Sequence, residues 1–424
     1  MTFSDTTSSS SGVPENGFTI DESIKSFALG RSALFLAITT LSCDALGADP
    51  RVFQSGNLSL TPLLNVNFTD EDNIYRRNVD EVDSLITTIT PSLAAVYSNG
   101  VSGWQLDLQA SDVNFDASDV DDYSSWSING SAHLELNEFN LLDFNAGLQD
   151  DVQRRGTGFS QFGPLPDEPD TFEQSTLGVT YQLGSQNARL RLRVGGNSTS
   201  MEYTNNEEFA TGRNYDQTGL QSTLLWRVSP RTDILVEART NDFEYDQALF
   251  AGGQTTASLD SSEQYVFLGV SWEATARTTG SIRIGRADKE FDSPTRQDVD
   301  GPSYEVGIEY SPLTYSTFNL TASQNYGEGI GIGNATERKL LGINWQHEWR
   351  PSLSTVVSIQ SEDSDYVGSA LTDNVDRLSA RLNYELARWL DVNIGVSTEE
   401  RETNVTQAFG FDQSGLSIGF QASF

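Results

Sequence analysis

Three arginines at alternate positions are the residues of this chain best suited to bind a ligand. Arg189, Arg191 and Arg193 are separated by Leu190 and Leu192. Successive side chains of a β-strand point to opposite faces, so this spacing would place the three guanidinium groups on one face as a short ladder. The planar guanidinium binds carboxylate and phosphate groups. If that face lines a channel, the ladder would select an anionic or sugar solute.

Further charged residues fall on the same face of other strand-like segments. The candidate lumen-lining residues are Arg189, Arg191, Arg193, Arg227, Arg239, Arg377, Arg381, Glu237, Glu273, Glu305 and Glu309. Both signs of charge occur together, which leaves two interpretations open. The residues form either a selective path for a solute, or a wall of cross-strand ion pairs that stiffens the protein.

Residues that could support catalysis do not form a recognisable set. The chain has two histidines. We expect His133 to lie on the same face as the arginines, and His347 to lie on the opposite face between Trp345 and Trp349. The stretch Gly415–Gly419 matches G-x-S-x-G, but no helix can follow it, so the nucleophile-elbow interpretation fails. We therefore predict no enzymatic activity, no catalytic residues and no cofactor.

Acidic residues crowd one predicted loop, at Asp116, Asp119, Asp121 and Asp122. Their carboxylates could hold a divalent cation, but the EF-hand spacing and its final glutamate are missing. A solvated acidic loop is the favoured interpretation. We predict no defined metal site, while divalent cations remain candidate partners of the acidic loops.

The elements that must position these residues are β-strands. In the last nine residues the apolar side chains share one face of a strand; they are Leu416, Ile418, Phe420, Ala422 and Phe424. The same period of two repeats from Leu58 onward, and no long stretch competes with it at helical spacing. The apolar run 32–41 is too short by about half to cross a bilayer as a helix. A chain that ends inside such a strand on an aromatic residue is typical of bacterial outer-membrane barrels, in which the last strand pairs with the first.

Short and long connectors alternate along the chain. The pattern predicts short turns near 98–103, 137–139, 184–186, 229–231, 277–279, 311–314, 350–351 and 387–388. It predicts long loops near 69–83, 115–123, 153–173, 199–214, 245–261, 287–302, 327–337, 363–374 and 400–412. Eight turns and nine loops make seventeen connections, hence eighteen strands, an even count as bacterial barrels have. The predicted fold is all-β: a transmembrane antiparallel up-and-down β-barrel over residues 58–424, with sixteen strands as the alternative if one hairpin lies outside the wall.

The tryptophans give an independent check on this assignment. Six of the seven fall near predicted short turns; they are Trp104, Trp226, Trp272, Trp345, Trp349 and Trp389. Amphipathic rings prefer the membrane interface, so these residues predict an aromatic girdle at the end with the short turns. In outer-membrane barrels that end is periplasmic.

The N-terminal segment resembles an export signal. Lys25 and Arg31 precede the apolar run 33–38, and small residues follow it. This order predicts a polar leader plus signal peptide over residues 1–47, with cleavage near Gly47 or Ala48, and a short periplasmic segment over 48–57. Lipid attachment at Cys43 is the weaker alternative.

The charge excludes one class of partner. The chain carries 60 acidic and 26 basic residues among 424, for a formal net charge of −34. Nucleic-acid binding needs a basic surface, so we expect no nucleic acid. The expected partners are outer-membrane lipid and lipopolysaccharide.

One segment near the start carries a family resemblance. A strand leads into Asp72–Arg76, spaced acids follow, and the next strand contains Thr90–Leu93. This arrangement resembles the β-barrel porin family associated with exopolysaccharide operons, over roughly residues 56–424. The resemblance implies location in the cell outer membrane and a role in polysaccharide export, without a residue-level mechanism.

We therefore predict a porin-like barrel for passage or secretion of a polysaccharide or other polar solute. The alternative is a structural or docking barrel with acidic, cation-binding extracellular loops.

Overall fold

The computed structural model describes residues 52–206, 211–246, 250–251, 254–255, 257–275, 277–328, 333–404 and 409–424. The predicted leader, signal peptide and cleavage site lie outside these residues. Within them, no helix is long and apolar enough to cross a membrane.

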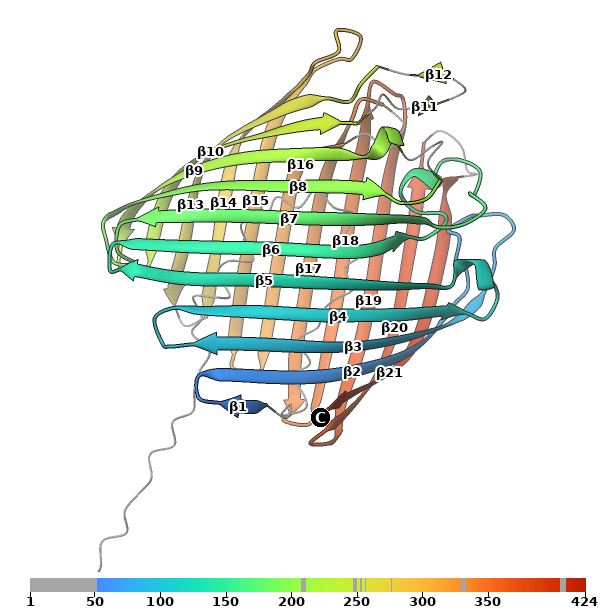
Figure 1. The fold of residues 1–424 in the computed structure, drawn as a ribbon. Coiled ribbons are helices and arrows are strands. Elements are labelled where there is room, and N and C mark those ends of the chain that lie inside the picture. The colour runs from blue at the N-terminus through green and yellow to red at the C-terminus, as the bar shows by residue number, and fades with distance from the viewer. Residues whose placement is uncertain are drawn as a thin grey trace, which may run out of the picture. The chain divides into compact units, whose positions relative to one another are not determined.

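Eighteen long antiparallel strands form one closed sheet. They are β2 (Leu58–Glu71), β3 (Ser84–Ser98), β4 (Gly103–Phe115), β5 (Tyr123–Asn137), β6 (Asn140–Gln153), β7 (Asp170–Leu183), β8 (Leu190–Tyr203), β9 (Tyr215–Ser229), β10 (Thr232–Tyr245), β13 (Ser261–Thr275), β14 (Thr278–Phe291), β15 (Val299–Leu313), β16 (Ser316–Glu328), β17 (Ala335–Arg350), β18 (Leu353–Val367), β19 (Thr372–Ala387), β20 (Leu390–Thr403) and β21 (Phe411–Ser423). Each pairs with its neighbours along the chain, and Figure 1 shows β2–β8 crossing in front of β17–β21 as two walls of a cylinder. The predicted eighteen-stranded barrel is confirmed.

Short strands and 3-10 helices lie in the segments that connect the long strands. The strands β11 (Phe250–Ala251) and β12 (Gln254–Thr255) form a separate hairpin, and three short 3-10 helices are η2 (Asp119–Asp121), η3 (Gly158–Ser160) and η4 (Thr211–Arg213). All of them lie in connections that were predicted as long loops. This end of the barrel is called the loop end below, and the opposite end the turn end.

The last strand closes the cylinder onto the first, as the sequence predicts. β21 pairs with β2 from Leu63↔Ser423 to Glu71↔Gly415. The short strand β1 (Phe53–Ser55) pairs with the part of β2 that β21 does not reach. The predicted periplasmic segment 48–57 is therefore partly a strand of the same sheet (Figure 1).

Alternation along each strand separates an apolar outer face from a polar inner face. On β9, Leu220, Leu224 and Trp226 are 65%, 43% and 47% exposed, whereas Thr223 between them is 5% exposed. Large apolar side chains are exposed in the same way around the whole sheet. In a barrel that crosses a membrane, that surface faces lipid, because side chains alternate between lipid and lumen.

The turn end carries the predicted aromatic girdle. Tyr97 stacks on Trp104 with ring centroids 6.1 Å apart, and Phe318 stacks on Trp345 at 6.1 Å. His347 lies against Trp349 with centroids 4.3 Å apart, on the outer face where it was expected. Several boundaries differ from the prediction. β15 runs to Leu313, so the turn expected at 311–314 lies at 314–315, and β14 runs to Phe291, into the loop expected at 287–302.

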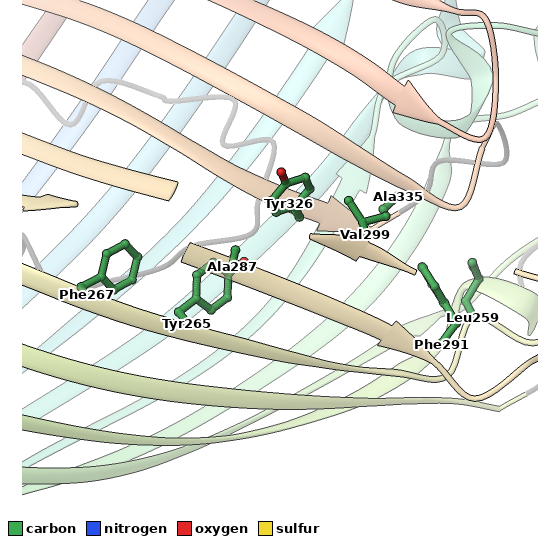
Figure 2. Close-up of a cluster of buried hydrophobic side chains, with 8 residues drawn as sticks. All are labelled: Leu259, Tyr265, Phe267, Ala287, Phe291, Val299, Tyr326 and Ala335. Atoms are coloured by element: carbon green, nitrogen blue, oxygen red, sulfur yellow. The ribbon is translucent and has the colours of Figure 1, made fainter. Parts of the chain in front are cut away.

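The loop end contains a buried apolar cluster that the period-two pattern does not predict. Figure 2 shows its members, which are Leu259, Tyr265, Phe267, Ala287, Phe291, Val299, Tyr326 and Ala335. The cluster joins strands β13–β17 to the segment that precedes β13. One sector of the loop end is thus a packed core rather than an open rim.

Candidate functional site

The lumen has two chemically different walls. The first, here called the ion-paired wall, is formed by the inner faces of β8–β10 and β13–β15. Asp233 accepts hydrogen bonds from both Arg191 and Arg227, the latter at 3.3 Å from Nε. Arg191 is only 4% exposed. Asp233 of β10 thus joins Arg227 of the neighbouring β9 and Arg191 of β8, one strand further along the sheet, and such cross-strand pairing is what the stiffening interpretation of the sequence expects.

The centre of the ion-paired wall is a four-residue network. The Arg239 guanidinium donates to both oxygens of Glu305, at 2.7 and 3.0 Å, and also to Glu237. Arg283 donates to Glu305 at 2.8 Å. Glu237 is completely buried and also accepts a hydrogen bond from Thr223. A bidentate arginine–carboxylate pair holds its geometry firmly, so this network is structural.

The predicted arginine ladder is not assembled as a ladder. Arg189 precedes β8 and is exposed in the turn, because β8 begins at Leu190. Arg191 is paired with Asp233, and Arg193 donates from Nε to Gln182 at 2.7 Å. The three guanidinium groups thus have different surroundings: Arg189 is exposed, Arg191 binds a carboxylate and Arg193 binds an amide.

The remaining candidates lie at several levels of the barrel. Glu273 and Glu309 have the inner-face parity but are exposed near the turn end. Arg377 and Arg381 lie on the inner face of β19, on the other side of the lumen from the ion-paired wall.

The second wall, here called the amide wall, is formed by the inner faces of β2–β7 and β17–β21. At mid-height most of its inner-face residues are neutral and polar, or are glycine: Asn65, Asn67, Thr90, Gln109, Asn129, Asn145, Gly147, Gln149, Gln174, Gly178, Asn344, Ser358, Gln360, Ser379, Asn383, Asn393, Gly395, Ser397, Ser417, Gly419 and Gln421. Two charged residues, Asp107 on β4 and Arg381 on β19, interrupt this set. Their register is continuous: Asn67 lies opposite Gly419, which lies opposite Asn393, which lies opposite Asn383. Such side chains offer both donors and acceptors without a fixed charge.

A loop divides the lumen near the loop end. The crossing loop, residues 154–169, begins after β6 and reaches β18 and β20 on the far side. Its Gln161 lies 3.1 Å from Arg401, and its Phe162 packs edge-on against Tyr366 with centroids 5.4 Å apart. Arg401 also lies over the Phe162 ring at 4.2 Å. Contacts across the barrel of this kind require the loop to lie inside it.

The root of the crossing loop is fastened by a buried latch. Arg155 donates to Asp121 at 2.8 Å from Nε, and Tyr75 donates to the same carboxylate at 2.8 Å. Burial alone would raise the pKa of Asp121, but hydrogen bonds, led by the one from Arg155, outweigh burial and lower that pKa. The hydrogen bond to Asp121 likewise raises the pKa of Arg155. The latch is therefore an ion pair over the physiological range.

Backbone geometry also holds the root in place. Gly156 has a φ of +83°, and a Cβ there would lie 2.0 Å from the carbonyl oxygen of Tyr75. Glycine is thus required at this position by both conformation and space. Arg154 adds an ion pair to Glu71 at 2.9 Å.

Between the crossing loop and the opposite strands lies a constriction, a cavity of about 50 Å³. Its charged lining residues are Arg76, Arg338, Arg377, Arg401, Glu362, Asp373 and Glu399. Several of these pairs are loose: Arg377 lies 3.4 Å from Glu362 and 3.5 Å from Glu399, and Arg338 lies 3.9 Å from Glu362. Four cations face three anions, although the whole chain is strongly acidic.

Asp121 corrects the expectation of a solvated acidic loop. Its side chain is 6% exposed because it serves the latch. Within the part of the chain that the structure describes, no group of three or more His, Cys, Asp and Glu side chains is placed to hold a metal ion. Divalent cations at the other acidic residues stay a prediction.

His133 lies on the inner face as expected. Its Nδ1 is 2.6 Å from Asp143, and its Nε2 is 3.9 Å from Glu135. The pair belongs to the wall near the turn end.

The crossing loop is the main feature that the sequence-based prediction missed. The segment was predicted as a long polar loop, but it contains Arg154, Arg155, Phe159 and Phe162 beside three glycines. Adjacent arginines and aromatic residues are unusual in a solvated loop of an acidic chain. That composition is the available signal that the loop folds inward.

Comparisons with known proteins agree with the architecture. Residues 49–424 match the model of a family described as "Putative beta-barrel porin 2". A comparison with curated protein sequences found no match.

Solved structures share the fold at low identity. OccK2 (OpdF) of Pseudomonas aeruginosa, in complex with glucuronate, is 13% identical with a TM-score of 0.46, and the match covers 86% of this chain and 98% of that chain. OccAB3 of Acinetobacter baumannii is 12% identical with a TM-score of 0.45, covering 87% and 100%. The copper transporter OprC is 12% identical with a TM-score of 0.44, covering 84% of this chain and 66% of that chain.

Proposed function

The chain belongs to this β-barrel porin family, and from that membership we propose that it is an outer-membrane conduit for polar solutes, above all sugars and segments of polysaccharide. In this proposal the loop end faces outward and the turn end faces the periplasm, following the general pattern of outer-membrane barrels. The barrel acts by positioning and selecting the solute rather than by chemistry on it.

The amide wall supports a sugar as the solute. A sugar presents many hydroxyl groups, each of which both donates and accepts hydrogen bonds. Side chains such as Asn67, Asn145 and Gln149 can match those hydroxyls without binding them as tightly as a charge would. Because conduction requires binding that is weak and repeated, a neutral polar wall suits passage of such a molecule.

The crossing loop is the single observation that carries the proposal. Its Gln161 contacts Arg401 on the opposite side of the barrel, and the small cavity beside this contact, the constriction, is lined mainly by polar and charged groups. A small solute would be selected at this point. A polysaccharide would need the loop to move away from Arg401 and Tyr366.

Conductance of the purified barrel in a planar bilayer tests the proposal. The wild type should give small, discrete steps. A variant in which a short Gly-Ser linker replaces residues 157–166 should give steps several-fold larger, because the loop no longer fills the lumen. A barrel that stays closed in both forms would refute a conduit.

Swelling of liposomes in solutions of sugars of increasing size measures which solutes pass through the barrel. Wild-type barrels should admit small sugars, and the shortened variant should also admit oligosaccharides. Deletion of the gene tests the polysaccharide role and should lower the amount of secreted polysaccharide. Expression of the latch variant Asp121→Asn in the deletion strain tests whether loop movement must be controlled. If it must, this variant should not restore the normal amount.

A further inference from the structure

One arginine on the amide wall has no partner of its own. Arg381 lies on the inner face of β19, opposite Val356 of β18 and Gly395 of β20. It is half-buried. Among the described residues, no hydrogen bond, ion pair or ring contact engages its side chain. The inner-face residues on either side of it along β19, Ser379 and Asn383, are neutral.

Other arginines of the inner face form ion pairs. Arg377, four residues along β19, lies between Glu362 and Glu399. Arg191 and Arg239 are held in the ion-paired wall. A guanidinium carries five N–H donors, so an unpaired one inside a protein is a site with unused binding capacity.

The residues across the strand pairs from Arg381 are small. Gly395 lies next to it across the strand pair, and Ser417 follows on β21. A Cβ at residue 395 would lie 2.6 Å from the Ser417 hydroxyl oxygen and 3.9 Å from Nε of Arg381. Because residue 395 is glycine, the Ser417 hydroxyl can lie close to the β20 backbone, on the same side as the Arg381 side chain.

We propose that Arg381 is a binding station for the carboxylate of an acidic sugar on its way through the barrel. The planar guanidinium would take the carboxylate in a bidentate pair, while Ser417 and the amide side chains would contact the sugar hydroxyls. The station lies on the turn-end side of the constriction. This inference rests on the proposed function, since it names the class of solute that the conduit prefers.

Equilibrium binding to the purified barrel in detergent tests the station without requiring passage. The probes are sodium galacturonate and the neutral sugar galactose, which differ in the carboxylate. The wild type should bind galacturonate more tightly than galactose. Arg381→Gln should weaken galacturonate binding about tenfold, as expected for loss of one charged hydrogen-bonded pair. Galactose binding should not change.

Two further variants make the result specific. Arg381→Lys keeps the charge but loses the planar fork, and it should give an intermediate affinity for galacturonate. Arg388→Gln changes an exposed arginine in the turn between β19 and β20, and it should bind like the wild type. If Arg381→Gln binds galacturonate as the wild type does, or if the wild type does not distinguish the two sugars, the station is refuted.

Conductance separates this inference from the proposed function. A barrel that binds galacturonate through Arg381 but never conducts would retain the station and refute the conduit. A barrel that conducts but has no preference for galacturonate would retain the conduit and refute the station.

Discussion

The ion-paired wall and the amide wall are built from the same strand pattern but use their polar groups differently. On the ion-paired wall, Glu237 and Arg239 are buried and bound to each other. On the amide wall, Asn129 is exposed to the lumen and Asn145 is half-buried. The first wall directs its polar groups toward the protein, and the second leaves them available to water and solute. In the proposed conduit, the ion-paired wall would maintain the shape of the barrel, and the amide wall would contact the solute.

The largest effect is expected on the ion-paired wall. Glu237→Gln leaves Arg239 and Arg283 with one carboxylate in place of two, in a position that water does not reach. Breaking a buried ion pair from one side should lower the free energy of unfolding by about 3 kcal/mol. Urea unfolding in lipid vesicles, followed by tryptophan fluorescence, measures this change.

Glu273→Gln is the matched control, because the same substitution is made at an exposed residue of the same face. It should change the free energy of unfolding by less than about 0.5 kcal/mol. Equal losses in the two variants would contradict the division into two walls.

A smaller effect is expected at the latch that joins the crossing loop to the wall. Asp121→Asn removes the charge that Arg155 binds and should weaken the latch by about 2 kcal/mol. The conductance of the variant should fluctuate more at neutral pH, because the loop leaves its closed position more often. Single-channel recording measures the dwell times.

The latch also predicts a dependence on pH. The pKa of Asp121 is lowered in the folded protein, so the stabilisation is fully present above the ordinary aspartate pKa of about 3.9 and is lost as the pH falls through the lowered value. Conductance of the wild type should therefore be constant from neutral pH to about pH 4 and become larger and noisier below it. An unchanged acid response in Asp121→Asn would show that another group is responsible.

The smallest effect is expected on the amide wall. Asn145→Ala removes one half-buried amide whose site water can fill, so the free energy of unfolding should change by less than about 0.5 kcal/mol. Passage of small sugars should slow slightly, as one of many weak contacts is lost. A loss of stability comparable to that of Glu237→Gln would remove the distinction between the walls.

The architecture could be predicted because it follows from local patterns. Period-two alternation in segments such as 416–424 identifies strands, and the position of residues such as Trp226 separates the turn end from the loop end. Each of these signals depends only on neighbours in the sequence. The strand count, the closure of β21 onto β2 and the girdle were therefore accessible.

The partners inside the lumen could not be predicted in the same way. Whether Arg191 meets Asp233 while Arg381 meets no partner depends on the register between strands, which differs from pair to pair. The course of the crossing loop depends on Asp121 and Arg401, which lie far from it in the sequence. The sequence thus shows which inner-face residues are charged, but it does not show which of them form ion pairs.

The seam between the first and last strands has a consequence for how the molecule is made. β2 pairs with β3 over its whole length from Leu58, but it pairs with β21 only from Leu63, and β1 pairs with Leu58–Leu60. The sheet cannot close into a barrel until β21 pairs with both β20 and β2. Deletion of β21 would leave β20 and β2 as unpaired edges, and such edges can pair with strands of other chains.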